Sequence, residues 1–137
     1  MSDFPVTVFH NPACGTSRNV LEMVRAAGHE PEVVEYLKAG WTADQLRALF
    51  AEAGLTPRDA MREKGSPAAE LGLLEAGVSD DAILAAMVEH PILVNRPLVK
   101  TPKGAALCRP SEKVLDLLDS APETFTKEDG EVVRPKG

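Results

Sequence analysis

Residues 6–36 read VTVFHNPACGTSRNVLEMVRAAGHEPEVVEY, and the order of patterns in this stretch decides the predicted fold. Val6 to Phe9 is short, β-branched and aromatic, which is typical of a buried strand. Turn residues from Asn11 to Ser17 end that strand, and apolar residues then recur at helical spacing up to Gly28. A second short strand follows at Val33 to Tyr36. This order favours a parallel strand pair joined by a crossover helix.

The rest of the chain alternates between helical and extended patterns. Thr42 and Gln45 have the spacing of a capping box, ahead of an apolar stripe that ends at Gly54. The elements predicted after position 36 are helices from about 42, 56, 66 and 79, strands at 92–94, 98–101 and 105–108, and a last helix from 111. We therefore interpret residues 1–137 as a single domain, with a helical insertion at about 56–90 and a loosely held tail at about 119–137.

Composition excludes several classes of protein. The chain has 137 residues, 15 Lys and Arg against 21 Asp and Glu, and a net charge of −6. This argues against a generally basic nucleic-acid binder, although a few gathered cations could still bind an anion. The N-terminal sequence lacks the features of a signal peptide, and no stretch reaches the roughly 18 apolar residues of a membrane span. We expect a cytoplasmic protein with reduced thiols, no nucleic-acid or membrane partner and no metal site.

Cys14 is the residue most suited to chemistry. It lies in the turn between a predicted strand and a predicted helix, where unpaired backbone N–H groups and the helix dipole favour a thiolate and attract anions. The alternative is a small buried hydrophobic residue, which most free cysteines are. Position 17 is Ser, so Cys14 has no Cys-x-x-Cys partner, and Val20 stands where a phosphatase loop needs arginine. Both comparisons indicate one-thiol chemistry with the second thiol supplied from elsewhere.

Several longer segments resemble one known family. They are residues 10–19, 90–97, 107–112 and 125–131. In order and in register they resemble the glutaredoxin-coupled arsenate reductases of the ArsC type, and the resemblance covers about residues 6–131. It implies an α/β fold with a thioredoxin-like (glutaredoxin-like) mixed sheet, shared by a β-α-β unit and a β-β-α unit with the helical insertion between them. It also implies a cis peptide bond between Arg96 and Pro97.

The same resemblance implies roles for individual residues. Cys14 would be the nucleophile, Arg62, Arg96 and Arg109 would bind the oxyanion, and His10 would tune the cysteine. Physical chemistry agrees, because arginines offset the repulsion between a thiolate and an anionic substrate. A protonated His10 and hydrogen bonds from Ser17 would also lower the pKa of Cys14.

Each of these residues has a plainer alternative. Arg62 could be an ordinary solvated arginine, His10 a structural histidine at a strand end, and Ser17 a residue that only shapes the turn. Arg96 and Arg109 are less easily explained in this way, because each lies at a strand end beside a proline or a helix cap. Cys108 is interpreted as a bystander.

The resemblance finally implies a function. Arsenate would be reduced to arsenite for arsenic detoxification, with glutathione as co-substrate, a glutaredoxin as partner and no tightly bound cofactor. Two alternatives stay open at this stage. One is another glutathione-dependent thiol oxidoreductase, and the other is an Spx-like transcription regulator that is not an enzyme.

Overall fold

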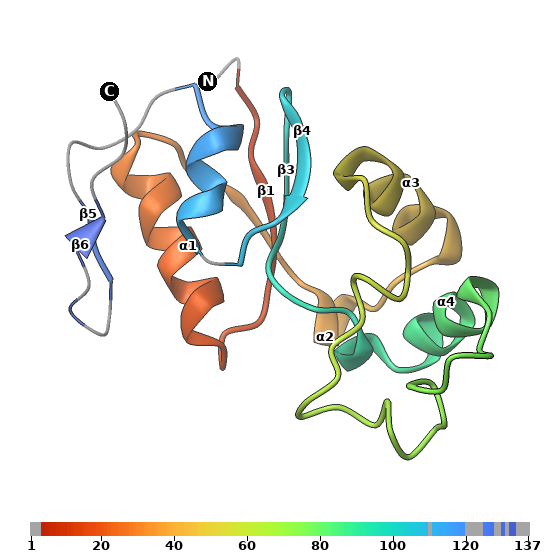
Figure 1. Cartoon of the computed structure of the whole chain (residues 1–137). Coiled ribbons are helices and arrows are strands. Elements are labelled where there is room, and N and C mark those ends of the chain that lie inside the picture. Colours follow the sequence, from red (N-terminus) through yellow and green to blue (C-terminus); the bar gives the residue numbers. More distant parts are fainter. Residues whose placement is uncertain (1–3, 110, 120–124, 128–129, 131, 134–137) are drawn as a thin grey trace. The chain divides into compact units, whose positions relative to one another are not determined.

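The computed structural model describes residues 4–109, 111–119, 125–127, 130 and 132–133. Its centre is a four-stranded sheet in the order β2-β1-β3-β4. The strands are β1 (Thr7–His10), β2 (Glu32–Glu35), β3 (Leu98–Thr101) and β4 (Gly104–Leu107). β1 and β2 are parallel, whereas β3 pairs antiparallel with both β1 and β4. The mixed sheet and the thioredoxin-like arrangement predicted from the sequence are therefore confirmed (Figure 1).

Helix α1 (Gly15–Ala26) connects the two parallel strands. The helix begins directly after Cys14, which is its N-cap residue, and its last turn is followed by Gly28 with a φ of 94°. Glycine tolerates this left-handed conformation without the clash that a side chain would cause. The β-α-β unit thus follows the predicted order and places Cys14 where the chain passes from sheet to helix.

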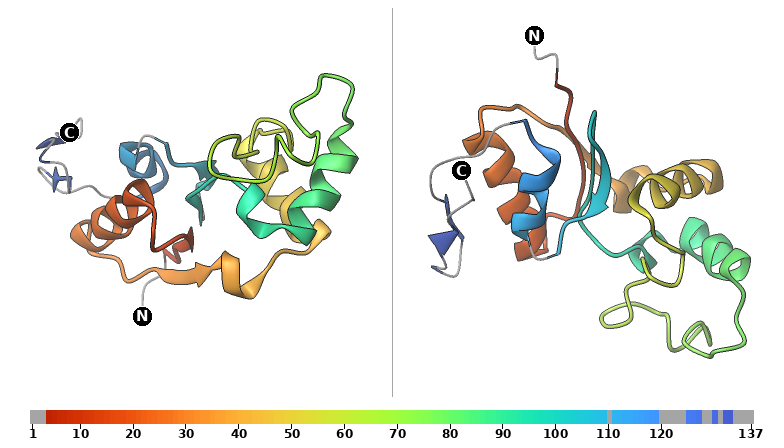
Figure 2. Two further views of the ribbon diagram at one scale, coloured as in Figure 1. Left: turned by 90° about the horizontal axis from the view of Figure 1, so that it is seen from below. Right: turned by 45° about the horizontal axis from the view of Figure 1, so that its top comes forward.

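One face of the sheet is covered by α1 and by the 3-10 helix η2 (Ser111–Leu117), which lie side by side in Figures 1 and 2. Val8 and Val99, neighbours across β1 and β3, lie in the same cluster as the inner residues of both helices. The buried members of this core are Val6, Val8, Val20, Leu21, Met23, Val24, Val99, Cys108, Val114, Leu117 and Leu118. Each fully buried valine or leucine contributes about 1.5–3 kcal/mol, so this cluster fixes α1 and η2 on the sheet.

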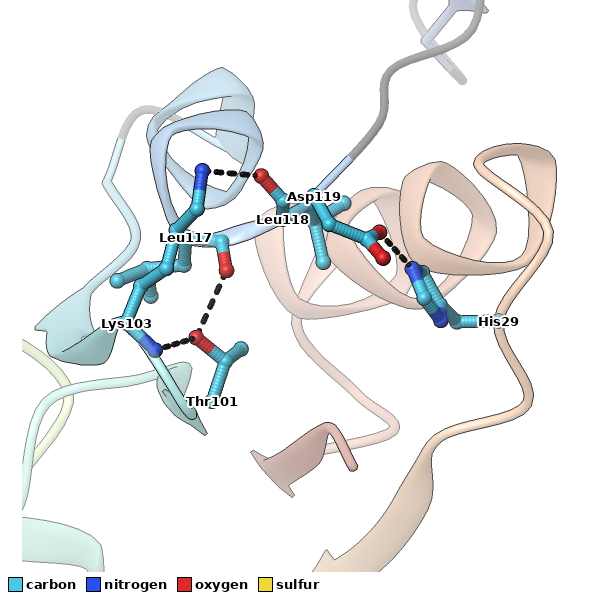
Figure 3. A network of polar contacts seen from close by, with 6 residues as sticks. All are labelled: His29, Thr101, Lys103, Leu117, Leu118 and Asp119. Carbon is cyan, nitrogen blue, oxygen red and sulfur yellow. Dashed lines mark hydrogen bonds and ion pairs between the residues drawn. The ribbon is translucent and has the colours of Figure 1, made fainter. Parts of the chain in front are cut away.

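The end of η2 is held by the hairpin between β3 and β4. The Thr101 hydroxyl donates to the carbonyl of Leu117 at 2.7 Å, and Lys103 Nζ donates to the carbonyl of Leu118 at 2.8 Å. Figure 3 shows both contacts, together with the hydrogen bond between His29 Nε2 and Asp119 Oδ1 at 2.7 Å. These groups satisfy carbonyls that have no partner within a helix that is ending.

A second compact unit comprises residues 36–95. Its helices are α2 (Tyr36–Ala39), α3 (Ala43–Ala53), α4 (Asp80–Glu89) and the 3-10 helix η1 (Pro91–Leu93). The predicted capping box is confirmed, because Thr42 and Gln45 exchange both of its hydrogen bonds at the start of α3. Gly54 ends α3 in the left-handed conformation, and the Ser79 side chain caps α4. Within the described ranges, no helix has the length and apolar composition needed to cross a membrane.

Two of the predicted helices in this unit are wrong. Thr56 and Asp59 exchange hydrogen bonds as at a helix start, but only single turns follow between 57 and 74. Gly65 and Gly72 have positive φ values of 70° and 72°, which interrupt helical propagation. Arg58 instead holds the chain by donating to the carbonyls of residues 73, 75 and 78.

The strand predicted at 92–94 is also wrong. The segment forms η1, because Pro91 fixes the first helical position and the N–H of Leu93 donates to the carbonyl of His90. Val94 then makes only an isolated bridge with Met61. Three apolar residues in a row do not by themselves distinguish a strand from a turn of helix.

The tail predicted from about residue 119 lies mostly outside the described residues. Its described parts include β5 (Phe125–Thr126) and β6 (Val132–Val133), which form an antiparallel pair. Lys127, directly after β5, forms an ion pair with Glu112 of η2 at 2.9 Å. At least this part of the C-terminal segment is therefore attached to the first compact unit.

Candidate active site

Cys14 is held by the backbone of the turn that joins β1 to α1. Its N–H donates to the carbonyl of Asn11 at 3.0 Å, and its own carbonyl accepts from the N–H of Arg18 at the same distance. The Asn11 side chain closes the turn by accepting from the N–H of Ala13 at 2.9 Å. Cys14 itself is extended, with no side-chain cap to the helix. Its sulfur therefore lies at the helix N-terminus without being used for capping.

The surroundings of Cys14 favour the thiolate. Its residue is 8% exposed, and burial, the largest single influence, raises the pKa. Four groups act in the opposite direction, namely the backbone N–H groups of Ser17 and Thr16 and the guanidinium groups of Arg96 and Arg109. Together they outweigh burial, so the pKa of Cys14 lies below the ordinary value for a thiol. At neutral pH, a larger fraction of Cys14 is therefore the nucleophilic thiolate than for an ordinary cysteine.

Arg109 is the cation in direct contact with the sulfur. Its Nη1 lies 3.8 Å from Cys14 Sγ and also donates to the carbonyl of Arg96 at 3.0 Å. The strand that leads to it is fixed, because the N–H of Cys108 donates to the carbonyl of Pro97 at 2.9 Å. The Arg96–Pro97 peptide bond is cis, as predicted. Two distant segments, 96–97 and 107–109, thus meet beside the cysteine.

His10 and Ser17 form a buried pair behind the turn. His10 Nδ1 lies 2.7 Å from Ser17 Oγ, and the N–H of Asn11 donates to the same oxygen at 3.1 Å. Because Oγ accepts from Asn11, its own hydrogen can be donated to His10. Ser17 therefore turns its hydroxyl toward the histidine and its backbone N–H toward the thiolate.

The pKa of His10 decides how this residue can influence Cys14. Burial lowers its pKa, and the charges of Arg18 and Arg25 act in the same direction, whereas Glu35 opposes them. The ring is therefore mostly neutral at pH 7. His10 therefore influences Cys14 through its hydrogen bond to Ser17, which orders the first turn of α1. It does not place a positive charge beside the sulfur.

Arg62 lies in the second compact unit, where its Nε donates to the carbonyl of Lys64 at 2.7 Å. Its part in anion binding stays a prediction. Cys108 is 0% exposed within the core, and burial raises the pKa of its thiol to about 12. It is therefore a packing residue and an inert thiol. Among the described residues, no three His, Cys, Asp or Glu side chains gather in a way that could hold a metal ion.

Sequence reasoning gave no role to two residues, Arg18 beside Cys14 and Lys127 beside η2. Arg18 Nη1 donates to the carbonyl of Pro12 at 2.8 Å and so ties the turn to the helix. Its position four residues after Cys14, one helical turn on, was a usable signal. Lys127 reaches Glu112, three residues after Arg109. No local sequence pattern predicts this contact, because it joins residues that are 15 positions apart.

These features define a class of protein: a thioredoxin-like fold with one activated thiol at a helix N-terminus and guanidinium groups beside it. The chain belongs to the ArsC family, whose model matches residues 9–117. It is 62% identical over 134 residues to "Arsenate reductase ArsI1" of Synechocystis sp., covering 97% of this chain and 93% of that protein. It is 50% identical over 129 residues to an arsenate reductase of Escherichia coli K12, covering 93% and 92% of the two chains.

A solved structure agrees with these relatives. The structure of an arsenate reductase from Vibrio cholerae matches with a TM-score of 0.81 and 38% identity, over 85% of this chain and 100% of that one. The structural similarity therefore extends over most of this chain.

Proposed function

We propose that this protein is an arsenate reductase in which Cys14 is the nucleophile. The observation that carries the proposal is the contact of Arg109 Nη1 with Cys14 Sγ at 3.8 Å, at the N-terminus of α1. An activated thiolate and a guanidinium at one point suit attack on a small oxyanion. The two curated relatives named above, at 62% and 50% identity, carry the name arsenate reductase, which supports the same substrate.

The positive groups around Cys14 reduce the electrostatic repulsion between its thiolate and arsenate. Arsenate is mostly a dianion near neutral pH, so a thiolate that approaches it meets like charge. Arg96 and Arg109 both lower the pKa of Cys14, and the backbone N–H groups of Thr16 and Ser17 at the start of α1 favour negative charge at the same point. An acidic chain with a net charge of −6 needs such local concentration of positive charge. Arg62 completes the proposed set of arginines.

The reaction begins when the Cys14 thiolate attacks arsenic. An S–As bond forms and one arsenate oxygen leaves as water after protonation, which gives a thioarsenate ester. A glutathione thiolate then attacks the Cys14 sulfur and forms an S–S bond. Arsenic leaves with the electron pair of the S–As bond and is thereby reduced from As(V) to As(III), as arsenite. A glutaredoxin thiol removes glutathione from the mixed disulfide and restores Cys14.

The chain's own cysteines support a second thiol that is supplied from solution. Position 17 is serine, and Cys108, the only other cysteine in the sequence, is buried with a pKa of about 12. A buried thiol with a raised pKa is poorly suited to resolve the ester. We therefore propose glutathione as co-substrate, a glutaredoxin as partner, no tightly bound cofactor and a cytoplasmic location.

The test is arsenate-dependent NADPH consumption in the presence of glutathione, glutaredoxin and glutathione reductase. We expect turnover with the complete mixture and loss of turnover when glutathione or glutaredoxin is omitted. Cys14→Ser is the inactive control, because a hydroxyl is a much poorer nucleophile at neutral pH. Wild-type turnover that persists without glutathione would assign the reductant role to another thiol. Absence of turnover in the complete mixture would refute the proposal.

A further inference from the structure

The C-terminal segment is joined to η2 by an ion pair with one nearly buried partner. Lys127 Nζ lies 2.9 Å from Glu112 Oε1, and the lysine side chain is only 10% exposed. The hydrogen bond from Lys127 is the main cause that lowers the pKa of Glu112, which favours its carboxylate form. Because little water reaches the ammonium group, removing the partner of either charge is costlier than at an open surface. The pair therefore fixes two segments against each other.

Glu112 lies in the first turn of η2, three residues after Arg109. The inner side of this helix is anchored in the core by buried Ser111 and Val114. Arg109, in contrast, is exposed, and its Nη1 reaches Cys14 Sγ at 3.8 Å. A small rotation of the first turn would move the backbone from which Arg109 projects, because Arg109 precedes Ser111 by only two residues in the sequence.

The ion pair between Lys127 and Glu112 also neutralises a negative charge near the anion site. Glu112 is a carboxylate near the sequence position of the cation that contacts the thiolate, and an unneutralised carboxylate would weaken the attraction of that region for anions. Lys127 supplies the compensating charge from the C-terminal segment.

We infer that Lys127 is a positioning residue of the anion site: by its ion pair with Glu112 it fixes the first turn of η2 and so holds the guanidinium of Arg109 beside Cys14. The role of the site in arsenate reduction rests on the proposed function, but the placement of Arg109 at Cys14 does not. The C-terminal segment is thus part of the assembly that prepares the cysteine.

The experiment measures the alkylation rate of Cys14 by iodoacetamide against pH, with mass spectrometry to assign the modified cysteine. Lys127→Met should raise the apparent pKa of Cys14 by about half a unit, because Arg109 then spends less time at the sulfur. Lys127→Arg should retain the wild-type profile, since it restores the charge. Lys113→Met is the matched control: it removes a lysine from an exposed position of η2 and should leave the profile unchanged.

A reversed pair provides an independent test. Glu112→Lys alone should move the Cys14 profile away from that of the wild type, because it also breaks the ion pair, and combining it with Lys127→Glu should restore it. If Lys127→Met does not fold, the reversed pair decides: recovery supports the inference, and a profile as displaced as in Glu112→Lys overturns it. A lower thermal midpoint in Lys127→Met with an unchanged alkylation profile would also overturn it, because the pair would then only stabilise the fold.

Arsenate kinetics separate this inference from the proposed function. In the NADPH-coupled assay, Lys127→Met should raise the KM for arsenate roughly threefold, with kcat changed less than twofold. If wild-type protein does not reduce arsenate, the proposed function fails, while the alkylation profiles still decide the role of Lys127. If wild-type protein is active and Lys127→Met has unchanged KM and an unchanged profile, the inference alone fails.

Discussion

Removal of the Arg109 guanidinium should make Cys14 a weaker acid, and the structure sets the size of this effect. Arg109 Nη1 lies 3.8 Å from Cys14 Sγ. Two unit charges about 4 Å apart attract each other by about 1 kcal/mol in water and about 4 kcal/mol in a partly shielded protein site. Because Arg109 is exposed, the lower part of this range applies. One pKa unit corresponds to about 1.4 kcal/mol, so Arg109→Leu should raise the pKa of Cys14 by about one unit.

The assay is again the pH dependence of Cys14 alkylation. Well below the inflection, the rate of Arg109→Leu should be about tenfold lower than that of the wild type, because the thiolate fraction falls in proportion. Arg109→Lys should lie between the two, since it keeps a charge but loses the guanidinium fork that also reaches the carbonyl of Arg96. Arg47→Leu, which removes an exposed arginine from α3 in the other compact unit, is the control. Equal inflections in wild type and Arg109→Leu would refute the reasoning.

Three further predictions concern the thiols and the buried pair behind the turn. Cys108→Ser should leave most of the arsenate-dependent turnover intact but lower the free energy of unfolding by about 1–3 kcal/mol in urea titrations, because a hydroxyl replaces a buried thiol; loss of turnover in a folded variant would show that Cys108 takes part. Ser17→Ala should lower that free energy by about 1–3 kcal/mol, since His10 and the Asn11 N–H lose their partner, while the alkylation profile moves little because the backbone N–H remains. A profile that moves by a full unit would instead assign the effect to the hydroxyl. The lowered pKa of His10 means that the unfolded chain binds its proton more readily, so His10 should reduce stability as pH falls from about 6.5 toward its folded pKa. Unfolding experiments between pH 7 and 5 on wild type and His10→Gln should show a weaker pH dependence in the variant, and parallel curves would contradict this.

The sequence was sufficient for elements that local rules determine. The β1-α1-β2 unit follows from a short β-branched strand, a turn and a helical period, and the start of α3 follows from the Thr42–Gln45 capping box. The segment between 57 and 74 was not predictable in the same way. The hydrogen bond between Asp59 and Thr56 is formed as at a helix start. The helix does not continue after one turn, because glycines adopt positive φ and the Arg58 side chain binds a backbone carbonyl.

The residues of the candidate site also differ in whether local sequence patterns can predict them. Cys14 could be chosen from sequence because its position between strand and helix is a local property. The roles of Arg96 and Arg109 came from a family resemblance, because their approach to Cys14 depends on the pairing of β3 with β1 and β4. The neutral state of His10 could not be foreseen, since it depends on burial and on charges from α1 and β2. The same holds for Lys127, whose partner lies 15 residues away.

The most direct test of the central claim is to incubate the protein with glutathione and arsenate, without glutaredoxin, and to identify the modified cysteine by mass spectrometry. The account predicts a glutathione mixed disulfide on Cys14 that forms only when arsenate is present, with arsenite released in equal amount and Cys108 unmodified. Cys14→Ser should give neither product. Arsenite release without modification of Cys14, or an equal yield of mixed disulfide in the absence of arsenate, would contradict attack of the Cys14 thiolate on arsenate.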